Sequence, residues 1–303
     1  MLLRYAIRVL LAVGLLAGCA GAGTTSPAVA TDAVVVSSFD FGESAVVAEI
    51  YAQALENARV PVRRELRLGP RELVLPALRQ GLVDVVPEYV GTALATVAPS
   101  APAAADTAAA VAELAIALRP DGLRPLQPAP AQNQNGLAVT RATAQRLGLR
   151  TTSDLRGRAG RLTLTGPSEC SHREYCAAGL RAVYGLTFSD VVPYDLETQR
   201  VTALEQGLAD VAVVFTTDGL LRARDLVLLA DDRHLQPVEN VVPVVSERSM
   251  TRYGPRVAET LDRVSARLDS AGLALLNWRV DVAHADARDE ARSWLQQHAL
   301  LSG

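Results

Sequence analysis

The segment Cys170-Ser-His-Arg-Glu-Tyr-Cys176 brings two thiols and an imidazole close together in the chain. Thiols at this spacing form a disulfide in an oxidising compartment, and we expect Cys170 and Cys176 to be joined in that way. The alternatives are a free thiol pair and a metal site that uses His172, although these three ligands leave a zinc ion incompletely coordinated. The pair is therefore expected to be a structural link, with no metal site and no cofactor.

Sequence patterns that would indicate an enzyme are missing. The chain has no G-x-S-x-G turn, no H-E-x-x-H helix and no P-loop. The four histidines, at positions 172, 234, 284 and 298, lack the spacing of metal ligands. Hydrolysis would require a nucleophile and a base in one cleft, and no spacing suggests such a pair. We expect the protein not to be an enzyme.

A cysteine near the N-terminus has the surroundings of a lipid attachment site. Arg4 and Arg8 precede an apolar run at 9–17, which is too short to span a hydrocarbon core of about 30 Å and is typical of a signal peptide. Leu16-Ala17-Gly18-Cys19 resembles a bacterial lipobox, which predicts cleavage after residue 18 and a lipid on Cys19. The alternative is an ordinary cleavage site with an incidental cysteine.

These features predict the location of the mature protein. Residues 19–32 are mostly small or polar and are expected to form a flexible tether. The protein is expected in the cell envelope, at the outer face of the cytoplasmic membrane, with Cys19 as its only contact with the membrane.

Apolar runs that alternate between strand and helix patterns make up most of the remaining chain. Residues 34–36, 83–86 and 137–140 are typical of buried strands, whereas residues 44–57 and 70–81 have apolar side chains at helical spacing. This alternation predicts an α/β protein with mostly parallel sheets.

A ten-residue segment recurs in similar form later in the chain, which indicates two similar lobes. Residues 76–85 read PALRQGLVDV and residues 202–211 read TALEQGLADV, with seven identical positions at an offset of 126. Each copy reads as the end of a helix, a glycine cap and an aspartate that leads into a strand. Ligands of open α/β sheets bind at the carboxyl ends of strands, so we expect the turns after the two strands to face one cleft.

The charge balance excludes one class of partner. The chain has 30 basic and 33 acidic residues, a formal net charge of −3, and no block of like charge. A nucleic-acid-binding protein would present a basic face, so no nucleic-acid partner is expected.

Several motifs together resemble the substrate-binding proteins of bacterial ABC importers for osmoprotectants such as glycine betaine, choline and carnitine. The first loop of that family, G-S-K-N-F-T-E-Q, corresponds to Ser37-Ser-Phe-Asp-Phe-Gly-Glu-Ser44. The family's E-I-Y-A-Q-A-L-E and P-E-Y-T-G-T correspond to residues 49–56 and to Pro87-Glu-Tyr-Val-Gly-Thr92. Further matches follow in order at 68–69, 76–78, 81–84, 179–180, 184–186, 215–219, 231–232 and 243–245.

The resemblance implies a type II periplasmic-binding-protein fold, in which two α/β lobes joined by two crossing strands enclose a ligand cleft. The first lobe would contain residues 33–136 and 243–303, and the second lobe residues 137–242. The crossing strands would lie near 135–140 and 240–245, and the lobes would close on the ligand by a hinge.

The resemblance also assigns binding residues, with departures from the family pattern. Family members hold a quaternary ammonium in a cage of tyrosine rings. Tyr89 and Thr92 match family binding positions, and Phe215 keeps an aromatic ring. Asn135 and Glu239 replace cage tyrosines. Asp40 and Ser44 replace the asparagine and glutamine of the first loop.

Two ligand classes are compatible with these replacements. In one, Asp40, Asp218 and Glu239 hold a cation by charge. In the other, Asn135, Thr216, Thr217 and Asp218 bind a neutral, hydroxyl-rich or aromatic solute that stacks on Tyr89. The second is favoured because hydrogen-bonding side chains have replaced rings. The complete set of expected ligand-binding residues is Asp40, Phe41, Ser44, Tyr89, Thr92, Asn135, Phe215, Thr216, Thr217, Asp218 and Glu239.

The expected function is that of a lipid-anchored, monomeric receptor that captures a small solute and delivers it to an ABC permease with its ATPase subunits. The alternative is a lipid-anchored sensing or scaffold protein that uses the same fold without transport. Compaction of the protein on binding a ligand would distinguish the receptor from the scaffold.

Overall fold

The strands form two five-stranded sheets in a computed structural model that describes residues 32–100, 104 and 106–301. Cys19, the signal peptide and nearly all of the expected tether lie outside these residues. From Ala33 onward the chain forms one compact unit.

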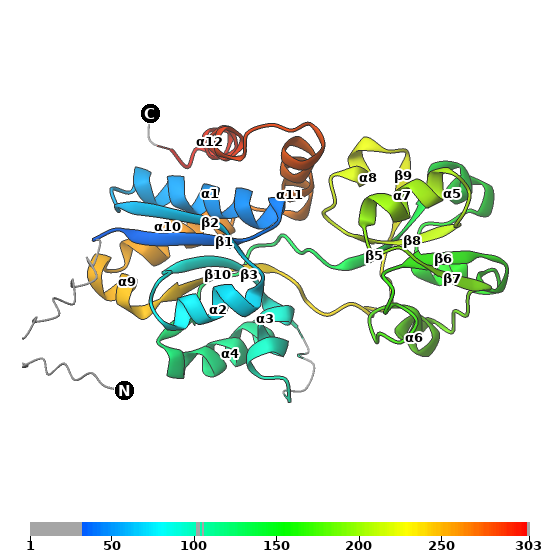
Figure 1. Cartoon of the computed structure of the whole chain (residues 1–303), viewed down its shortest axis with the longest axis horizontal. Helices are drawn as coiled ribbons and strands as arrows, with labels where there is room; N and C mark the ends of the chain where they lie inside the picture. The colour runs from blue at the N-terminus through cyan, green and yellow to red at the C-terminus, as the bar shows by residue number, and fades with distance from the viewer. Residues whose placement is uncertain (1–31, 101–103, 105, 302–303) are drawn as a thin grey trace, which may run out of the picture. The chain divides into compact units, whose positions relative to one another are not determined.

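The first sheet has the strand order β2-β1-β3-β10-β4 (Figure 1). The strands are β1 (Val34–Phe39), β2 (Val62–Gly69), β3 (Val85–Tyr89), β4 (Leu123–Pro125) and β10 (Val241–Ser246). β1 is parallel to both β2 and β3, whereas β10 is antiparallel to its neighbours β3 and β4.

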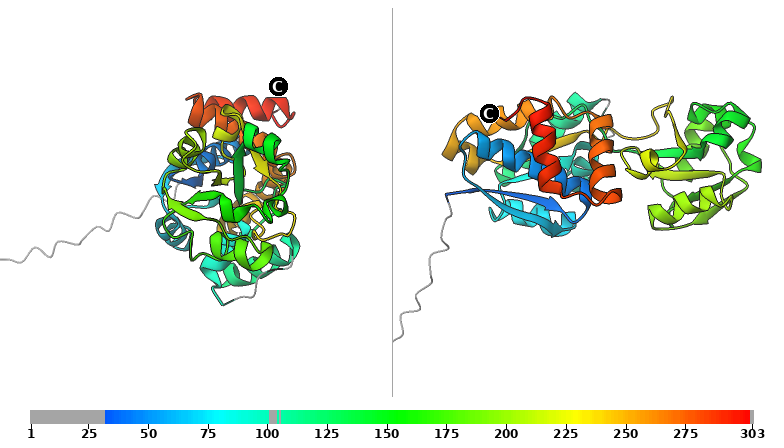
Figure 2. Two further views of the ribbon diagram at one scale, coloured as in Figure 1. Left: turned by 90° about the vertical axis from the view of Figure 1, so that its right-hand side faces the viewer. Right: turned by 90° about the horizontal axis from the view of Figure 1, so that it is seen from above.

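Eight α-helices accompany this sheet, and together they make what we call the first lobe. They are α1 (Gly42–Asn57), α2 (Arg71–Arg79), α3 (Val90–Val97), α4 (Thr107–Leu118), α9 (Glu247–Tyr253), α10 (Arg256–Ser265), α11 (Ser270–Asn277) and α12 (Ala287–Gln297). The C-terminal helix α12, drawn in red, lies across α1, drawn in blue (Figure 2). The core contains fully buried Val36, Ile50 and Tyr51. Chain far apart in sequence therefore completes this lobe.

The second sheet has the order β7-β6-β8-β5-β9 and forms the second lobe with its own helices. Its strands are β5 (Asn135–Thr140), β6 (Thr163–Gly166), β7 (Asp190–Pro193), β8 (Val211–Phe215) and β9 (Leu226–Leu229). Its helices are α5 (Arg141–Leu147), α6 (Ala177–Gly179), α7 (Glu197–Glu205) and α8 (Leu220–Ala223). β6 is parallel to β7 and β8, whereas β5 is antiparallel to β8 and β9.

The repeated ten-residue segment occupies the same place in both lobes. It spans the end of α2 and the start of β3 in the first lobe, and the end of α7 and the start of β8 in the second. Asp84 Oδ2 accepts a hydrogen bond from the backbone N–H of Val35 at 3.0 Å, and Asp210 Oδ2 accepts one from Thr163 at 2.9 Å. The aspartate therefore ties its strand to the neighbouring parallel strand in each lobe. The expected fold of two α/β lobes is confirmed.

The chain crosses between the sheets twice, at 126–134 and at 230–240. The two crossing segments pair with each other at Gln132 and Asn240 in an antiparallel bridge, and the Asn133 N–H donates to the Glu239 carbonyl at 3.1 Å. Each segment leads directly into β5 or β10, the strand next to an edge strand of its sheet. A rotation of one lobe against the other would be absorbed by these two segments.

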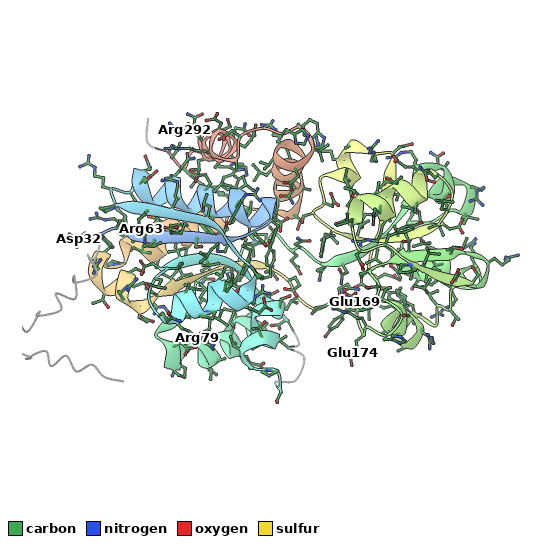
Figure 3. All side chains as sticks on the ribbon, in the orientation of Figure 1. Asp32, Arg63, Arg79, Glu169, Glu174 and Arg292 are labelled. Atoms are coloured by element: carbon green, nitrogen blue, oxygen red, sulfur yellow. A yellow bond between two sulfur atoms is a disulfide. The ribbon has the colours of Figure 1, made fainter. Side chains whose placement is uncertain are left out.

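A disulfide joins Cys170 and Cys176 in the loop before α6. Both cysteines are buried in the second lobe, and Glu169 beside them pairs with Arg173. Glu169 and Glu174 are labelled in Figure 3, and neither residue lines the pocket described below. Among residues 32–100, 104 and 106–301, no helix has the length and hydropathy needed to span a membrane.

Candidate functional site

A pocket of about 670 Å³ has walls from both lobes. The first lobe contributes the turn between β1 and α1, the start of α2, the end of β3 and the end of α11. The second lobe contributes the start of α7 and the turn after β8. The carboxyl ends of β1, β3 and β8 therefore meet at one cavity, as open α/β sheets place their ligand sites.

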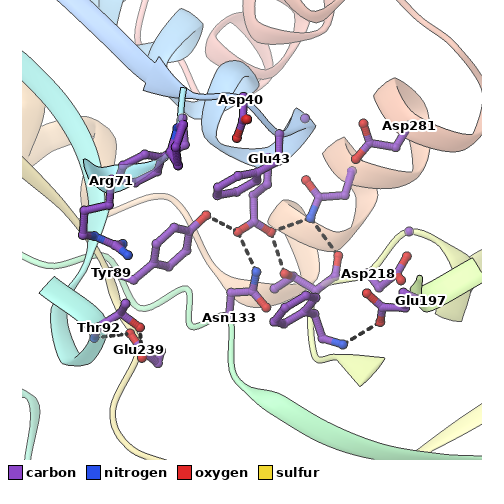
Figure 4. Close-up of a pocket in the computed structure, with 18 of the residues that line it drawn as sticks. Asp40, Glu43, Arg71, Tyr89, Thr92, Asn133, Glu197, Asp218, Glu239 and Asp281 are labelled. Atoms are coloured by element: carbon purple, nitrogen blue, oxygen red, sulfur yellow. Dashed lines mark hydrogen bonds between the residues drawn. The ribbon is translucent and has the colours of Figure 1, made fainter. Parts of the chain in front are cut away.

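Glu43, at the start of α1, accepts hydrogen bonds from both lobes (Figure 4). Its Oε1 accepts from the Tyr89 hydroxyl at 2.5 Å and from Asn133 Nδ2 at 2.9 Å. Its Oε2 accepts from Thr217 Oγ1 and from Asn277 Nδ2, each at 2.5 Å. Thr217 belongs to the second lobe, whereas Tyr89 and Asn277 belong to the first. A single buried carboxylate therefore joins the two halves of the molecule.

Burial dominates the titration of this cluster. Loss of water raises the pKa of Glu43, although the four donors act in the opposite direction. Burial and the neighbouring Glu43 charge raise the pKa of Tyr89 well above its ordinary value, so its hydroxyl remains a donor.

A turn of the second lobe, Thr217-Asp218-Gly219, packs directly on the first lobe. Asn277 Nδ2 also donates to the Thr217 carbonyl at 2.8 Å. A Cβ on Gly219 would lie 2.6 Å from the backbone N and Cα of Trp278, the first residue of the short helix η5 (Trp278–Val282). Glycine is therefore required for this close approach between the lobes.

The internal repeat extends beyond the ten residues and supplies matching positions in the pocket wall. At the offset of 126, α2 corresponds to α7 and β3 to β8 at both ends. Three pairs at this offset line the pocket: Arg71 with Glu197, Tyr89 with Phe215, and Thr92 with Asp218. The same backbone position therefore faces the cavity from each lobe, but with opposite charge at the first pair.

The first-lobe side of the wall contains an Arg–Glu pair. Arg71 Nη2 lies 2.8 Å from Glu88 Oε2, and the Arg71 guanidinium lies 4.8 Å from the centre of the Phe39 ring. Glu239 accepts hydrogen bonds from Thr92 Oγ1 at 2.5 Å and from Thr92 N at 3.1 Å. Burial raises the pKa of Glu239.

On the other side of Glu43, carboxylates of both lobes come together. Figure 4 shows Glu197, Asp218 and Asp281 on the side of Glu43 away from Arg71. Glu197 accepts a hydrogen bond from the Phe215 N–H at 2.6 Å, and burial together with the Asp218 charge raises its pKa. Asp281 covers Gly42, because a Cβ at position 42 would lie 1.9 Å from Asp281 Oδ1.

The structure places eight of the expected ligand-binding residues in the pocket wall: Asp40, Phe41, Tyr89, Thr92, Phe215, Thr217, Asp218 and Glu239. Three others do not line it. Ser44 turns inward and accepts from the Phe39 N–H, and Thr216 Oγ1 accepts from the Gln134 N–H. Asn135 begins β5 and lines a separate small cavity inside the second lobe. The neighbouring positions Asn133 and Thr217 face the pocket instead.

The pocket also contains residues that the sequence did not single out: Glu43, Arg71, Asn133, Glu197, Asn277 and Asp281. Glu43 could have been predicted from the sequence, because it lies in the first-loop motif. Arg71 and Glu197 would follow from extending the repeat five residues toward the N-terminus. Nothing in the local sequence marks Asn277, which reaches the site only because α11 packs beside α1.

The site shows no arrangement for metal chemistry. The described part of the chain has no cluster of three or more Cys, His, Asp or Glu side chains that could hold a metal ion. The carboxylates of the pocket are instead spread around a cavity large enough for a small organic solute.

Two lobes of equal strand order that share one pocket define a bilobed solute-binding protein of type II topology. The chain belongs to the family described as the substrate-binding domain of ABC-type glycine betaine transport systems, which matches residues 32–297. This is a family of solute-binding proteins and not of enzymes, and the protein is a substrate-binding protein of ABC-type glycine betaine transport.

Known proteins similar to this chain cover most of its length. The glycine betaine-binding protein YehZ of Escherichia coli (strain K12) is 29% identical over 287 residues, which is 91% of this chain and 94% of that protein. A glycine-betaine-binding protein of Pseudomonas aeruginosa is 29% identical over 271 residues, 86% of each chain. A solved structure described as a glycine betaine/carnitine/choline ABC transporter superposes with a TM-score of 0.82 at 22% identity, covering 89% of this chain and all of that one.

Proposed function

We propose that the protein is an extracytoplasmic lipoprotein that captures a small osmoprotectant-like or related polar or aromatic solute and delivers it to the permease of an ABC importer. The observation that carries this proposal is the meeting of Tyr89 and Thr217, one from each lobe, at Glu43 in the pocket wall. A cavity completed by both lobes is suited to a ligand whose binding changes the angle between them.

The mechanism is a population shift, and no bond is made or broken. A solute that contacts both lobes gains its full set of contacts only in the closed arrangement and stabilises that arrangement by its differential affinity. The crossing segments 126–134 and 230–240 act as the hinge. The closed form then presents both lobes together to the permease.

The proposal includes the division of the chain and its anchoring. Residues 1–18 are the signal peptide, Cys19 carries the lipid and residues 19–32 are the tether. The first lobe comprises residues 33–134 and 241–303, and the second lobe residues 135–240. Each boundary lies two residues before the one expected from the sequence, and this keeps β5 and β10 whole. The mature protein is a monomer at the outer face of the cytoplasmic membrane.

Of the expected ligand-binding residues, those in the pocket wall are proposed to contact the solute: Asp40, Phe41, Tyr89, Thr92, Phe215, Thr217, Asp218 and Glu239. Phe41 and Phe215 support this assignment because each is a large apolar side chain left 40% or more exposed at the cavity.

The test is a solute screen followed by a measurement of shape. The chain without residues 1–19 is screened by thermal shift against quaternary amines, protonated amines, polyols and aromatic solutes, and each hit is examined by small-angle X-ray scattering. We expect a stabilising solute that also decreases the radius of gyration, and loss of both effects in Phe215→Ala. A protein that binds none of these classes and never compacts would contradict the receptor and favour the scaffold.

A further inference from the structure

The pocket wall is strongly acidic. Seven carboxyl side chains line it: Asp40, Glu43, Glu72, Glu197, Asp218, Glu239 and Asp281. Among the described lining residues Arg71 is the only basic side chain, and its charge is already paired with Glu88. Arg200 acts on Glu197 and Asp218 and Arg67 acts on Asp281 at longer range, but neither arginine lines the cavity. A cavity of this kind raises the local concentration of cations.

Two buried amide oxygens at the pocket have no hydrogen-bond donor. The Nδ2 groups of Asn133 and Asn277 each donate a hydrogen bond to Glu43. These bonds fix the orientation of each amide, because a flipped amide would place its oxygen against the carboxylate. Oδ1 of each is then buried without a partner in the protein. Asn277 lines the pocket with only 4% of its surface exposed. A buried acceptor without a donor is costly, and a ligand with N–H groups would satisfy it.

The aromatic rings do not form a cage. Phe39, Phe41 and Tyr89 form a row of stacked rings, with centres 5.8 Å and 6.2 Å apart. One member of the row, Phe39, already carries the Arg71 guanidinium. Phe41 and Phe215 leave 40% and 47% of their surface exposed at the cavity, but Phe215 comes from the second lobe and is stacked with none of these three rings. The rings open to a cation without N–H donors are therefore few beside the seven carboxyl groups. The acceptors of this site are carboxylate and amide oxygens.

We propose that the pocket binds a small organic cation that carries N–H donors, an ammonium or guanidinium compound, in preference to a quaternary ammonium or a neutral solute. The cationic group lies between Glu197 and Asp218 of the second lobe and Asp281 of the first. This inference rests on the receptor function proposed above and narrows its ligand. It departs from the neutral solute that the replacements at Asn135 and Glu239 favoured, because Asn135 does not reach the pocket.

A matched pair of ligands isolates the N–H donors from the charge. Putrescine and its bis-trimethylammonium analogue have the same charge and chain length, but only putrescine can donate hydrogen bonds. Calorimetric titration of the chain without residues 1–19 measures both, together with agmatine, choline and glycine betaine. We expect putrescine or agmatine to bind about tenfold or more tightly than any quaternary compound, because charged hydrogen bonds to carboxylates are lost on methylation.

Variants locate the binding site. Glu197→Gln and Asp218→Asn are expected to weaken amine binding by about tenfold each. A bound cation favours the ionised form of both carboxyl groups, and each variant removes one of them. Glu169→Gln, a carboxylate outside the pocket that pairs with Arg173, is the control and keeps full affinity. Thermal unfolding of each variant establishes that it is folded. If only one of the two pocket variants folds, that variant alone is sufficient to test the location of the site.

The outcomes separate the two proposals. Equal or tighter binding of the bis-trimethylammonium analogue, choline or glycine betaine would overturn the inference and leave the receptor function intact. Amine binding that survives both pocket variants would also overturn it. Failure of every compound to bind, with no compaction, would overturn both the inference and the receptor.

Discussion

Tyr89 and Thr217 donate hydrogen bonds of 2.5 Å to opposite oxygens of one carboxylate, Glu43. Tyr89 shares a lobe with Glu43, whereas Thr217 comes from the other lobe. The first contact therefore stabilises a lobe, and the second holds the two lobes together. The same acceptor serves the core of one half and the interface between halves.

This difference predicts unequal effects of removing the two hydroxyls. Thr217→Val keeps the side-chain shape but removes a buried bond between lobes worth about 1–3 kcal/mol, so the ligand-free protein should become more open. Tyr89→Phe should lower the free energy of unfolding by a similar amount without opening the lobes. Small-angle scattering and urea unfolding of both variants check this. An equal change in radius of gyration would contradict the assigned roles.

Gly219→Ala should push the lobes apart by sterics alone. The added Cβ meets backbone atoms of Trp278 at 2.6 Å, and backbone cannot move aside as a flexible side chain can. We expect about a tenfold loss of solute affinity, since the turn can no longer seat on the first lobe. Gly160→Ala is a matched control, because its nearest contact is 3.9 Å away. Unchanged affinity and scattering for Gly219→Ala would show that this contact is dispensable.

The pH dependence of stability should reflect Glu197. Burial and the neighbouring Asp218 charge raise its folded-state pKa from the ordinary value of 4.5 to about 9, against a smaller opposing effect of Arg200. The folded protein then binds more protons than the unfolded chain between these two values, so the free energy of unfolding falls as pH rises through the folded-state pKa. Asp281 of the first lobe adds negative charge near Asp218.

Urea unfolding between about pH 5 and pH 9 measures this decline. The slope should be shallower in Glu197→Gln than in the parent protein, and unchanged in Glu174→Gln, which lies outside the pocket. Parallel pH profiles for the parent and Glu197→Gln would rule out the raised pKa.

Removing the disulfide should destabilise the second lobe and spare the ligand site. The loop closed by Cys170 and Cys176 is short, and chain-entropy estimates give about 2 kcal/mol for such a loop. Cys170→Ser/Cys176→Ser should lower the denaturant midpoint, while solute affinity at low denaturant stays the same. Neither cysteine lines the pocket, so a large loss of affinity would indicate that the loop supports the site indirectly.

The fold could be predicted from the sequence because the patterns that indicate it are local and occur in both lobes. Periodicity places α1 and the apolar strands, and the repeat indicates two lobes of the same construction. Asp84 and Asp210 show why the repeat was informative, since each bonds the adjacent parallel strand in the same way. A hydrogen bond that recurs at the same place in both lobes is visible in the sequence as a repeated residue.

The site was only partly predictable because its centre is assembled over long distances. Glu43 and Asn277 are 234 residues apart and meet only after α11 packs beside α1. Family positions identified Tyr89 and Thr92, but they also suggested Asn135, whose strand register turns it away from the pocket. Asn133, two residues earlier, faces the pocket instead, and this depends on how the crossing segment enters β5, which no local sequence pattern indicates.

The pairing of Arg71 with Glu197 across the repeat has a consequence for how selectivity can change. The two residues stand at equivalent backbone positions in the walls that the two lobes contribute to the pocket, so the charge in one lobe can change while the other lobe stays unaltered. A related protein with the opposite charge at one of these two positions would favour a solute with a different charge distribution, while the fold of both lobes stays the same.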